Sequence, residues 1–180
     1  MGVAGDTRKA SFSRRLSDSA APIAKKFSFL KKRSGTDASL VVAQNAKLSR
    51  EEVANWSSSF EQLLRHKHGI ALFRLFLQRE FSEENIEFWI ACEEYKNTKD
   101  HKLLQKAREI FAEFVAVQAP KEVNLDSDTR TATEQSIESN RTDRAAFDNA
   151  QHRIEYLMEK DSWPRFIKSD LYMDLLTKSK

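Results

Sequence analysis

Apolar side chains between Leu48 and the C-terminus recur every three or four residues, in one stretch after another. An amphipathic α-helix requires that period, and no stretch alternates convincingly with the period of two that marks a strand. Only four Gly and three Pro are present, too few for the turns of an all-β fold, whereas twelve Phe and three Trp suit a compact helical core. The sequence therefore predicts an all-α domain. Helices are expected over 49–56, 57–69, 69–81, 82–96, 100–118, 126–137, 141–161 and 169–178, with a further short one beginning at Pro164.

Polar residues mark the expected starts of several of these helices. Ser82 is predicted to cap the helix over 82–96, whose acidic first turn suits the positive end of the helix dipole. Phe81 continues the helical spacing of the apolar residues before it. Pro164 cannot take a mid-helix position but fits the first turn of a new helix. The other predicted caps are Asp126 or Ser127 for the polar helix over 126–137, and Asp161 or Ser162 for the helix with Pro164.

Charge divides the chain into a basic tail and a mildly acidic body. Residues 1–50 hold 11 Lys or Arg against 3 Asp or Glu, a net charge of +8, whereas residues 51–180 hold 19 against 24, a net charge of −5. This asymmetry predicts an anionic surface as the partner of the tail. The expected organisation is a mostly flexible basic tail over 1–33, a polar linker over 34–48 and one helical domain over 49–180.

The tail has the pattern of a basic amphipathic segment. Its apolar residues lie three or four positions apart on one helical face, its basic residues lie opposite or beside them, and Pro22 predicts a kink or two short helices. Such segments lie well in anionic membrane surfaces, where each Lys or Arg contributes on the order of 1 kcal/mol. The predicted membrane-binding residues are Phe12, Leu16, Ile23, Phe27 and Leu30, with Arg14, Arg15, Lys25, Lys26, Lys31, Lys32 and Arg33.

Two other interpretations of the tail stay open. One is a disordered, solvated arm with no specific role, and the other is a nucleic-acid-binding arm, which the acidic body disfavours because it has no basic face. Serines that follow basic residues are candidate phosphorylation sites, and each phosphate would add about −1.5 to −2 charge. KKFSFLKKRSG also resembles the effector segment of the myristoylated alanine-rich kinase substrate proteins. The candidate sites are Ser11, Ser17, Ser28 and Ser34.

The sequence contains no motif of enzyme chemistry. It has no phosphate-binding loop, no G-x-G-x-x-G and no G-x-S-x-G, and the paired Glu83 and Glu84 fit a helix start better than a catalytic dyad. Cys92, the single Cys, lies within an apolar helix and is interpreted as a core thiol in a reducing compartment. No apolar run approaches the roughly 20 residues of a membrane span. A binding module with no catalytic site, metal or cofactor of its own is therefore expected.

Three polar clusters fall where two predicted helices meet, which is where binding residues gather. The first surrounds Ser82 and Asn85, the second surrounds Asn124, and the third runs from Leu157 to Arg165. Helix capping is the alternative explanation, because several of these residues are good caps. Capping alone leaves Asn85 and Asn124 without a role, so a joint binding site stays open beside it as the second interpretation.

The same segments resemble a known family. FSEENIEFWIACEEYK, APKEVNLDSDTR and FDNAQHRIEYLMEKDSWPRFIKSDLYMDLL are similar, in this order, to the box of the regulator of G-protein signalling family, over roughly Trp56 to Thr177. The short basic tail ahead of the box is most similar to the small subfamily. The resemblance implies an all-α fold of about nine helices in two lobes, which binds the α-subunits of heterotrimeric G proteins and accelerates their GTP hydrolysis.

Carried over by motif, the resemblance implies a contact surface centred on Asn124, which the family directs towards the catalytic glutamine and switch segments of the α-subunit. An amide cannot act as an arginine finger, so it is expected to hold the switch segments in the transition-state conformation. Nucleotide and Mg²⁺ would belong to the partner. The implied surface comprises Ser82, Glu84, Asn85, Asn124, Leu125, Asp126, Leu157, Asp161, Ser162 and Arg165.

The implied protein is a monomeric GTPase activator for α-subunits of the Gi/o or Gq class, not itself an enzyme, at the cytoplasmic face of the plasma membrane. The alternative is a scaffold that keeps the helical box and binds without accelerating hydrolysis. The sequence departs from the family at Phe81, where Tyr is common, at Trp163 and Pro164, and over 136–144. The tail lacks the Cys residues that small relatives can palmitoylate, so membrane attachment is expected to be reversible and salt-sensitive.

Overall fold

The computed structural model describes residues 48–139 and 143–179, and all regular elements in these two ranges are helical. The predicted tail over 1–33, and the linker up to residue 47, lie outside the described residues. The all-α prediction is confirmed, since the described ranges contain nine α-helices. These are α4 (Arg50–Ser58), α5 (Phe60–Arg65), α6 (Lys67–Arg79), α7 (Glu84–Lys96), α8 (Asp100–Ile110), α9 (Ser127–Glu138), α10 (Asp148–Leu157), α11 (Trp163–Phe166) and α12 (Asp170–Lys178), with π-helical turns η2 (Phe111–Val115) after α8 and η3 (Met158–Ser162) after α10.

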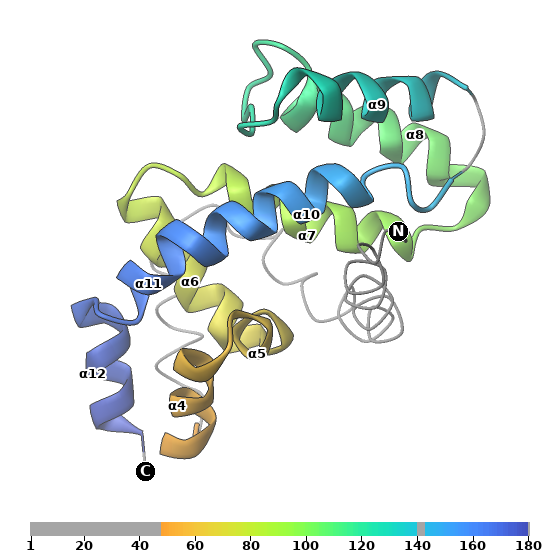
Figure 1. Cartoon of the computed structure of the whole chain (residues 1–180). Coiled ribbons are helices and arrows are strands. Elements are labelled where there is room, and N and C mark those ends of the chain that lie inside the picture. The colour runs from red at the N-terminus through yellow and green to blue at the C-terminus, as the bar shows by residue number, and fades with distance from the viewer. Residues whose placement is uncertain (1–47, 140–142, 180) are drawn as a thin grey trace, which may run out of the picture.

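The helices form two groups around a continuous apolar core (Figure 1). Helices α4, α5, α6, α11 and α12 lie together in one group, and α7, α8, α9 and α10 in the other. The first group is built around Phe73 and Phe166, whose ring centroids are 5.3 Å apart, and the second around Phe88 and Phe147, at 6.3 Å. The continuous helical run α10–η3–α11 crosses from one group to the other and so connects them.

Helix α4 is fastened to the C-terminal helices by two side-chain donors. The indole Nε1 of Trp163 donates to the backbone carbonyl of Trp56 (3.0 Å), and the hydroxyl of Tyr172 donates to the carbonyl of Val53 (2.9 Å). Tyr172 is buried, so this bond gives its hydroxyl a partner away from water. Leu48 is also buried against the core, so the last residue of the predicted linker lies within the domain.

The junction between α6 and α7 differs from the prediction. Phe81 adopts a left-handed backbone conformation (φ 54°) and is 91% exposed, so it does not continue the core face of α6. The backbone N–H of Ser82 donates to the carbonyl of Leu77 (3.0 Å), the six-to-one bond that ends a helix after a left-handed residue. Ser82 therefore closes α6, and the prediction that it caps α7 is wrong. Helix α7 begins at Glu84, preceded by Glu83.

The segment around Pro164 differs from the prediction in part. Pro164 lies in the first turn of α11, as predicted, but no break precedes that helix, because the chain stays helical from residue 148 to residue 166. Ser162 makes no capping hydrogen bond, and the carboxylate of Asp161 pairs with another side chain instead. The N–H that follows η3 bonds to a carbonyl five residues back rather than four. This wider turn accommodates the proline, which lacks the N–H that a continuous α-helix needs.

Gly69 lies inside α6, although a helix end was predicted there. A Cβ atom at this position would lie 2.8 Å from the carbonyl oxygen of Leu63 in α5. Glycine therefore permits a close approach of the two helices that no other residue allows without a shift. The break between α5 and α6 falls instead at His66, whose backbone is extended (φ −106°, ψ 119°).

Candidate functional site

Asn124 stands at the centre of a tight turn that is anchored on both sides. The backbone N–H of Val123 donates to the carbonyl of Phe114 (2.9 Å), and the N–H of Leu125 donates to the carbonyl of Val123 (3.0 Å). The second bond closes a three-residue turn. Val123 is fully buried and Leu125 is 7% exposed, whereas Asn124 is exposed. The two flanking side chains hold the turn in the core, and the amide points away from it.

Val123→Ala should lower the free energy of unfolding by about 2 kcal/mol, because it removes two buried methyl groups and leaves a cavity beneath the turn. Val117 offers a matched control, since it lies in the same connection but is 73% exposed. Val117→Ala should change the free energy of unfolding by less than about 0.5 kcal/mol. Urea unfolding followed by circular dichroism measures both values, and equal losses would contradict the anchoring role of Val123.

Helix α9 fixes the other side of the Asn124 turn. Asp126 is its N-cap, as predicted, and accepts hydrogen bonds from the backbone N–H (2.8 Å) and the hydroxyl (3.0 Å) of Thr129. These bonds hold the pKa of Asp126 below its usual range. Arg130, which sequence reasoning missed, donates to the carbonyl of Val115 and to the carboxylate of Glu122 (2.8 Å). The first turns of α9 therefore brace the connection on both sides of Asn124.

The first turn of α7 presents Glu84 and Asn85. The amide Nδ2 of Asn85 donates to the carbonyl of Ser82 (3.2 Å) and to the carboxylate of Glu84 (3.1 Å), which fixes its orientation. Partial burial raises the pKa of Glu84, and repulsion from Glu83 and Glu87 adds to the rise. Three apolar residues of the same helix, Ile86, Trp89 and Cys92, are fully buried. The polar turn is thus mounted on a helix that is fixed in the core.

Ion pairs join the Asn124 turn to α7. Lys121, three residues ahead of Asn124, lies 2.8 Å from Glu87 of α7 and 3.1 Å from Glu113. Arg74 of α6 also pairs with Glu87. Partial burial alone would raise the pKa of Glu87, but Lys121 and Arg74 outweigh burial and lower it. Lys121 is far more exposed than Glu87 or Arg74, so its pairs add little to stability, and their consequence here is the placement of one turn against another.

Arg165 joins the third polar cluster to the first. Its guanidinium, on α11, donates to both carboxylate oxygens of Glu80 at the end of α6 (2.7 and 3.3 Å) and pairs with Asp161. Two parallel bonds from one guanidinium fix geometry better than one. The hydrogen bonds to Glu80, and to a smaller extent those to Asp161, raise the pKa of Arg165. Leu157 is half-buried and Ser162 is only 8% exposed, so Asp161 and Arg165 are the accessible members of this cluster.

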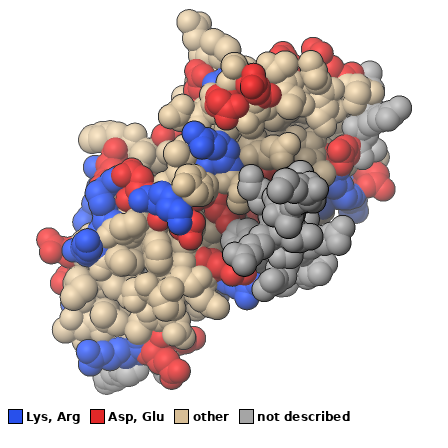
Figure 2. Space-filling view, in the orientation of Figure 1, with Lys and Arg blue, Asp and Glu red and all other residues tan. Residues whose placement is uncertain are grey.

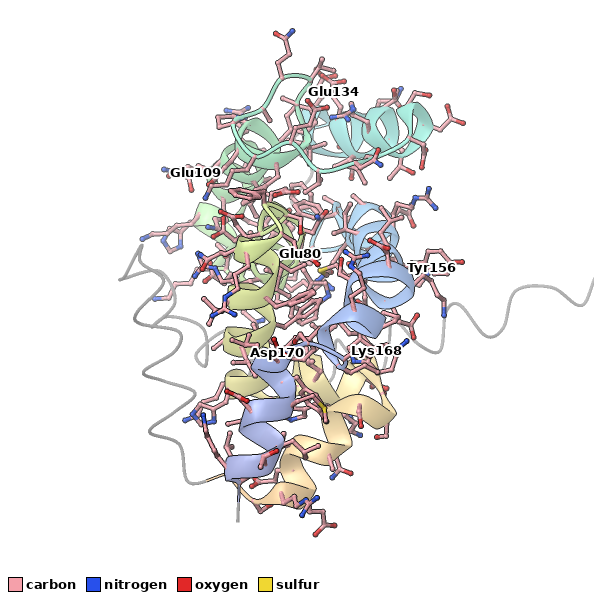
Figure 3. All side chains as sticks on the ribbon, turned by 90° about the vertical axis from the view of Figure 1, so that its left-hand side faces the viewer. Glu80, Glu109, Glu134, Tyr156, Lys168 and Asp170 are labelled. Atoms are coloured by element: carbon pink, nitrogen blue, oxygen red, sulfur yellow. The ribbon has the colours of Figure 1, made fainter. Side chains whose placement is uncertain are left out.

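Two ion pairs link the three polar clusters, Glu80 with Arg165 and Glu87 with Lys121. Glu80 lies near the middle of the view in Figure 3. Figure 2 shows basic and acidic side chains intermingled on the side that it draws, rather than one extended patch of either sign. Phe81 adds an exposed aromatic ring next to Glu80 in the chain. An aromatic ring rimmed by polar groups is typical of a protein interface.

In the described ranges, no group of three or more His, Cys, Asp or Glu side chains is placed to hold a metal ion. Cys92 is buried, as predicted, and burial raises the pKa of its thiol well above the usual value. Among the helices of this part of the chain, none is both long enough and apolar enough to cross a bilayer.

Comparison with known proteins shows the family to which this fold belongs. Residues 59–175 match the protein family described as the regulator of G protein signaling domain. The chain belongs to the regulator of G protein signaling family. Regulator of G-protein signaling 8 of Homo sapiens is 54% identical over 134 residues, which are 74% of this chain and 73% of the relative. The protein of the same name from Macaca fascicularis is 53% identical over 137 residues, 76% of this chain and 69% of the relative.

A much longer protein is also similar to this chain. Regulator of G-protein signaling rgs-7 of Caenorhabditis elegans is 54% identical over 131 residues, which are 71% of this chain but 16% of that protein. The residues matched to the regulator of G protein signaling domain, 59–175, include all three polar clusters from Ser82 to Arg165. Helix α4 precedes the matched residues yet lies against α12, so the folded unit extends beyond them.

Proposed function

We propose that this chain is a GTPase-activating protein for α-subunits of heterotrimeric G proteins, of the Gi/o or the Gq class. The observation that carries the proposal is the Asn124 turn. An uncharged amide is held outward between two buried anchors and tied through Lys121 and Glu87 to the turn that presents Asn85. The proposed contact surface comprises Ser82, Glu84, Asn85, Asn124, Leu125, Asp126, Leu157, Asp161, Ser162 and Arg165.

The chemistry available to Asn124 is positioning. A neutral amide donates and accepts hydrogen bonds but cannot neutralise developing phosphate charge, and G-protein α-subunits supply an arginine for that in cis. Asn124 would instead orient the catalytic glutamine and the attacking water of the partner. One hydrogen bond contributes about 0.5–1.5 kcal/mol, which is at most about tenfold in rate. A larger acceleration therefore needs further contacts.

Those contacts act by favouring one conformation of mobile switch segments. A surface accelerates the partner only if it binds the transition-state conformation more tightly than the ground state. The face around Glu80 suits this requirement because its turns are held by ion pairs and by buried anchors before any partner arrives. Asp161 and Arg165 would contact the switch segments from one side, and Asn85 and Asn124 from the other.

Two measurements test the proposal together. Single-turnover GTP hydrolysis by purified α-subunits of the Gi/o and Gq classes is measured with and without this protein. Association is measured with the same α-subunits carrying GDP alone or GDP with aluminium fluoride. Faster hydrolysis and tighter association with the fluoride complex are expected. Tight association without faster hydrolysis would establish the alternative function, a scaffold.

The proposed site of action is the cytoplasmic face of the plasma membrane, where a monomer would be held by the basic tail over 1–33. Net charge supports this proposal, because residues 1–50 carry +8 whereas residues 51–180 carry −5. The tail would therefore meet anionic lipids while the domain faces the α-subunit. Phosphorylation of Ser11, Ser17, Ser28 or Ser34 would weaken the attachment by adding negative charge.

Binding of the full chain to vesicles of phosphatidylcholine and phosphatidylserine should weaken steeply as salt rises, because exposed charges are screened. The double variant Ser17→Glu/Ser28→Glu should bind such vesicles several-fold more weakly at low salt. Thr131→Glu/Gln135→Glu makes the same change in net charge on exposed positions of α9 and should leave binding close to that of the parent. Co-sedimentation measures all three proteins, and salt-independent binding would contradict the electrostatic account.

A further inference from the structure

A groove of about 430 Å³ lies between α6, α7, α8 and the segment that carries Lys121. Apolar groups contributed by α7, α8 and η2 line part of it, namely Ile90, Ala91, Ile110 and Phe114. Its volume falls in the range of sites that take up a ligand or a few side chains of a peptide. The groove lies beside the proposed contact surface, and Glu87 and Lys121, whose ion pair ties two turns of that surface together, line one part of it.

The charged lining of the groove is unbalanced. Five carboxylates face three basic side chains across it. Each of the basic side chains already pairs with a carboxylate, as Lys106 does with Glu94 (3.7 Å). Glu83 and Glu109 have no cationic partner within the described residues. Figure 3 shows Glu109 on α8 at the flank of the face that carries Glu80. The groove therefore retains negative charge that is open to a cation.

A buried acceptor in the groove is also unused. The Oε1 atom of Gln78, on α6, is buried and accepts no hydrogen bond from the described part of the chain. Buried polar atoms are rarely left without a partner, because the lost hydrogen bond to water costs about 1–3 kcal/mol. The atom is closed to solvent in this structure, so an occupant with N–H groups would reach it only after the Gln78 side chain turned outward. The apolar floor and the negative rim together select a segment that is both apolar and basic.

We infer that the occupant is the chain's own basic segment over residues 25–33, KKFSFLKKR. This segment carries five Lys or Arg and no acidic residue, and it has Phe27, Phe29 and Leu30 between its basic ends. The aromatic and aliphatic side chains fill the apolar floor, and the flanking lysines reach Glu83 and Glu109. The charge match follows the division of the whole chain into a basic tail and an acidic domain.

The connecting chain is long enough for this contact. Fourteen residues, 34–47, separate the basic segment from Leu48. A chain of that length spans about 45 Å when extended and about 20 Å on average when flexible. A domain of this size has a radius of gyration of about 14 Å, so every part of its surface is within reach. A tethered segment is present at an effective concentration near the millimolar range, so a weak contact suffices.

The segment over residues 25–33 cannot bind the groove and a membrane at the same time. Phe27 and Leu30 cannot lie in a bilayer and against Ile90 at the same time, so anionic lipid competes with Glu83 and Glu109 for the segment. Glu83 and Lys121, which line the groove, directly precede the turns that present Asn85 and Asn124. The docked segment therefore lies at the edge of the proposed contact surface, and transfer to a membrane uncovers it.

Paramagnetic relaxation measures the contact in the full chain. A nitroxide is attached to Ser34→Cys, and Cys92 stays unlabelled because it is buried. The amide signals of Ala91, Glu109 and Ile110 should lose intensity, whereas those of α12 should not. High salt, or the variant Glu83→Gln/Glu109→Gln, should restore the intensity. Unchanged signals of α7 and α8, or losses spread evenly over the domain, would overturn the inference.

Vesicle binding gives an independent measurement. If most molecules hold the segment in the groove, Glu83→Gln/Glu109→Gln should bind phosphatidylserine-containing vesicles about threefold more tightly or better. Asp170→Asn/Asp174→Asn removes the same charge from exposed positions of α12 and controls for the general loss of repulsion. An equal gain in both double variants would show that the groove does not compete. Neither measurement depends on whether the protein accelerates GTP hydrolysis, so the two proposals fail separately.

Discussion

The double variant Asn85→Ala/Asn124→Ala should accelerate single-turnover GTP hydrolysis up to about 100-fold less than the parent protein, with its fold unchanged. Each amide is expected to supply one hydrogen bond in the transition state, and each bond is worth up to about tenfold in rate. The side chain of Asn124 is exposed, and Asn85 bonds only within its own turn, so neither supports the core. The loss should therefore appear in the reaction and not in stability.

Thermal unfolding and the rate assay together check this expectation. The matched control is Asn55→Ala/Asn149→Ala, which removes two exposed amides from α4 and α10, away from the proposed contact surface. The control should accelerate hydrolysis as well as the parent does. If the Asn85/Asn124 variant lost less than about threefold, the two amides would not act in the transition state, and the acceleration would have to come from the other contacts.

The second large effect concerns Glu155, which is buried in the core between α10 and α7. Its carboxylate accepts a hydrogen bond from the indole Nε1 of Trp89 (2.9 Å), and only 7% of the residue is exposed. Burial raises its pKa from 4.5 to about 7, against the effect of the Trp89 bond. Among the charged neighbours, Glu93 and Glu159 add to the rise and Lys96 opposes it. The folded protein therefore favours the protonated, neutral form of Glu155.

The sign of the resulting pH dependence follows from linkage. Below pH 4.5 the carboxyl is protonated in both the folded and the unfolded chain, so Glu155 favours neither state. Between about 4.5 and 7 the unfolded chain releases its proton first, so stability falls as pH rises. The rise of the Glu155 pKa from 4.5 to about 7 corresponds to about 3 kcal/mol in the free energy of unfolding. The folded protein has lost all of this stability above pH 7. Glu155→Gln keeps an acceptor for Trp89 and cannot ionise.

Glu155→Gln should therefore be about 3 kcal/mol more stable than the parent at pH 8 and nearly equal to it at pH 4.5. Urea unfolding across this range gives the difference at each pH. Glu138→Gln, on the exposed side of α9, should differ from the parent by less than about 0.5 kcal/mol throughout. A constant difference between Glu155→Gln and the parent across the pH range would mean that Glu155 is ionised in the folded protein.

Local patterns in the sequence were sufficient to predict the helices and their inward faces. The apolar period predicted α7 and the burial of Ile86 and Trp89, and the cap at Asp126 followed from a short polar residue ahead of a helix. The same patterns failed at Ser82 and Phe81. A residue that ends one helix and a residue that begins the next look alike in sequence, and the left-handed conformation of Phe81 depends on the bond from Ser82 back to Leu77.

The links that assemble the contact face were beyond local patterns. Arg165 and Glu80 are 85 residues apart, and Lys121 and Glu87 are 34 apart. In the sequence these residues look like the ordinary solvated charges of helix surfaces, because only the tertiary fold brings them together. The π-helical turn η3 was missed for a similar reason, since no periodicity marks a single wider turn.

The bond from Trp163 to the carbonyl of Trp56 has a mechanical consequence. Helix α4 is the first of the described helices, and this bond attaches it to the residue that follows Ser162 in the chain. A displacement of α4 therefore reaches α11, the helix that carries Arg165, through this bond. Movement of the N-terminal helix of the domain and the orientation of the Arg165 guanidinium are physically connected.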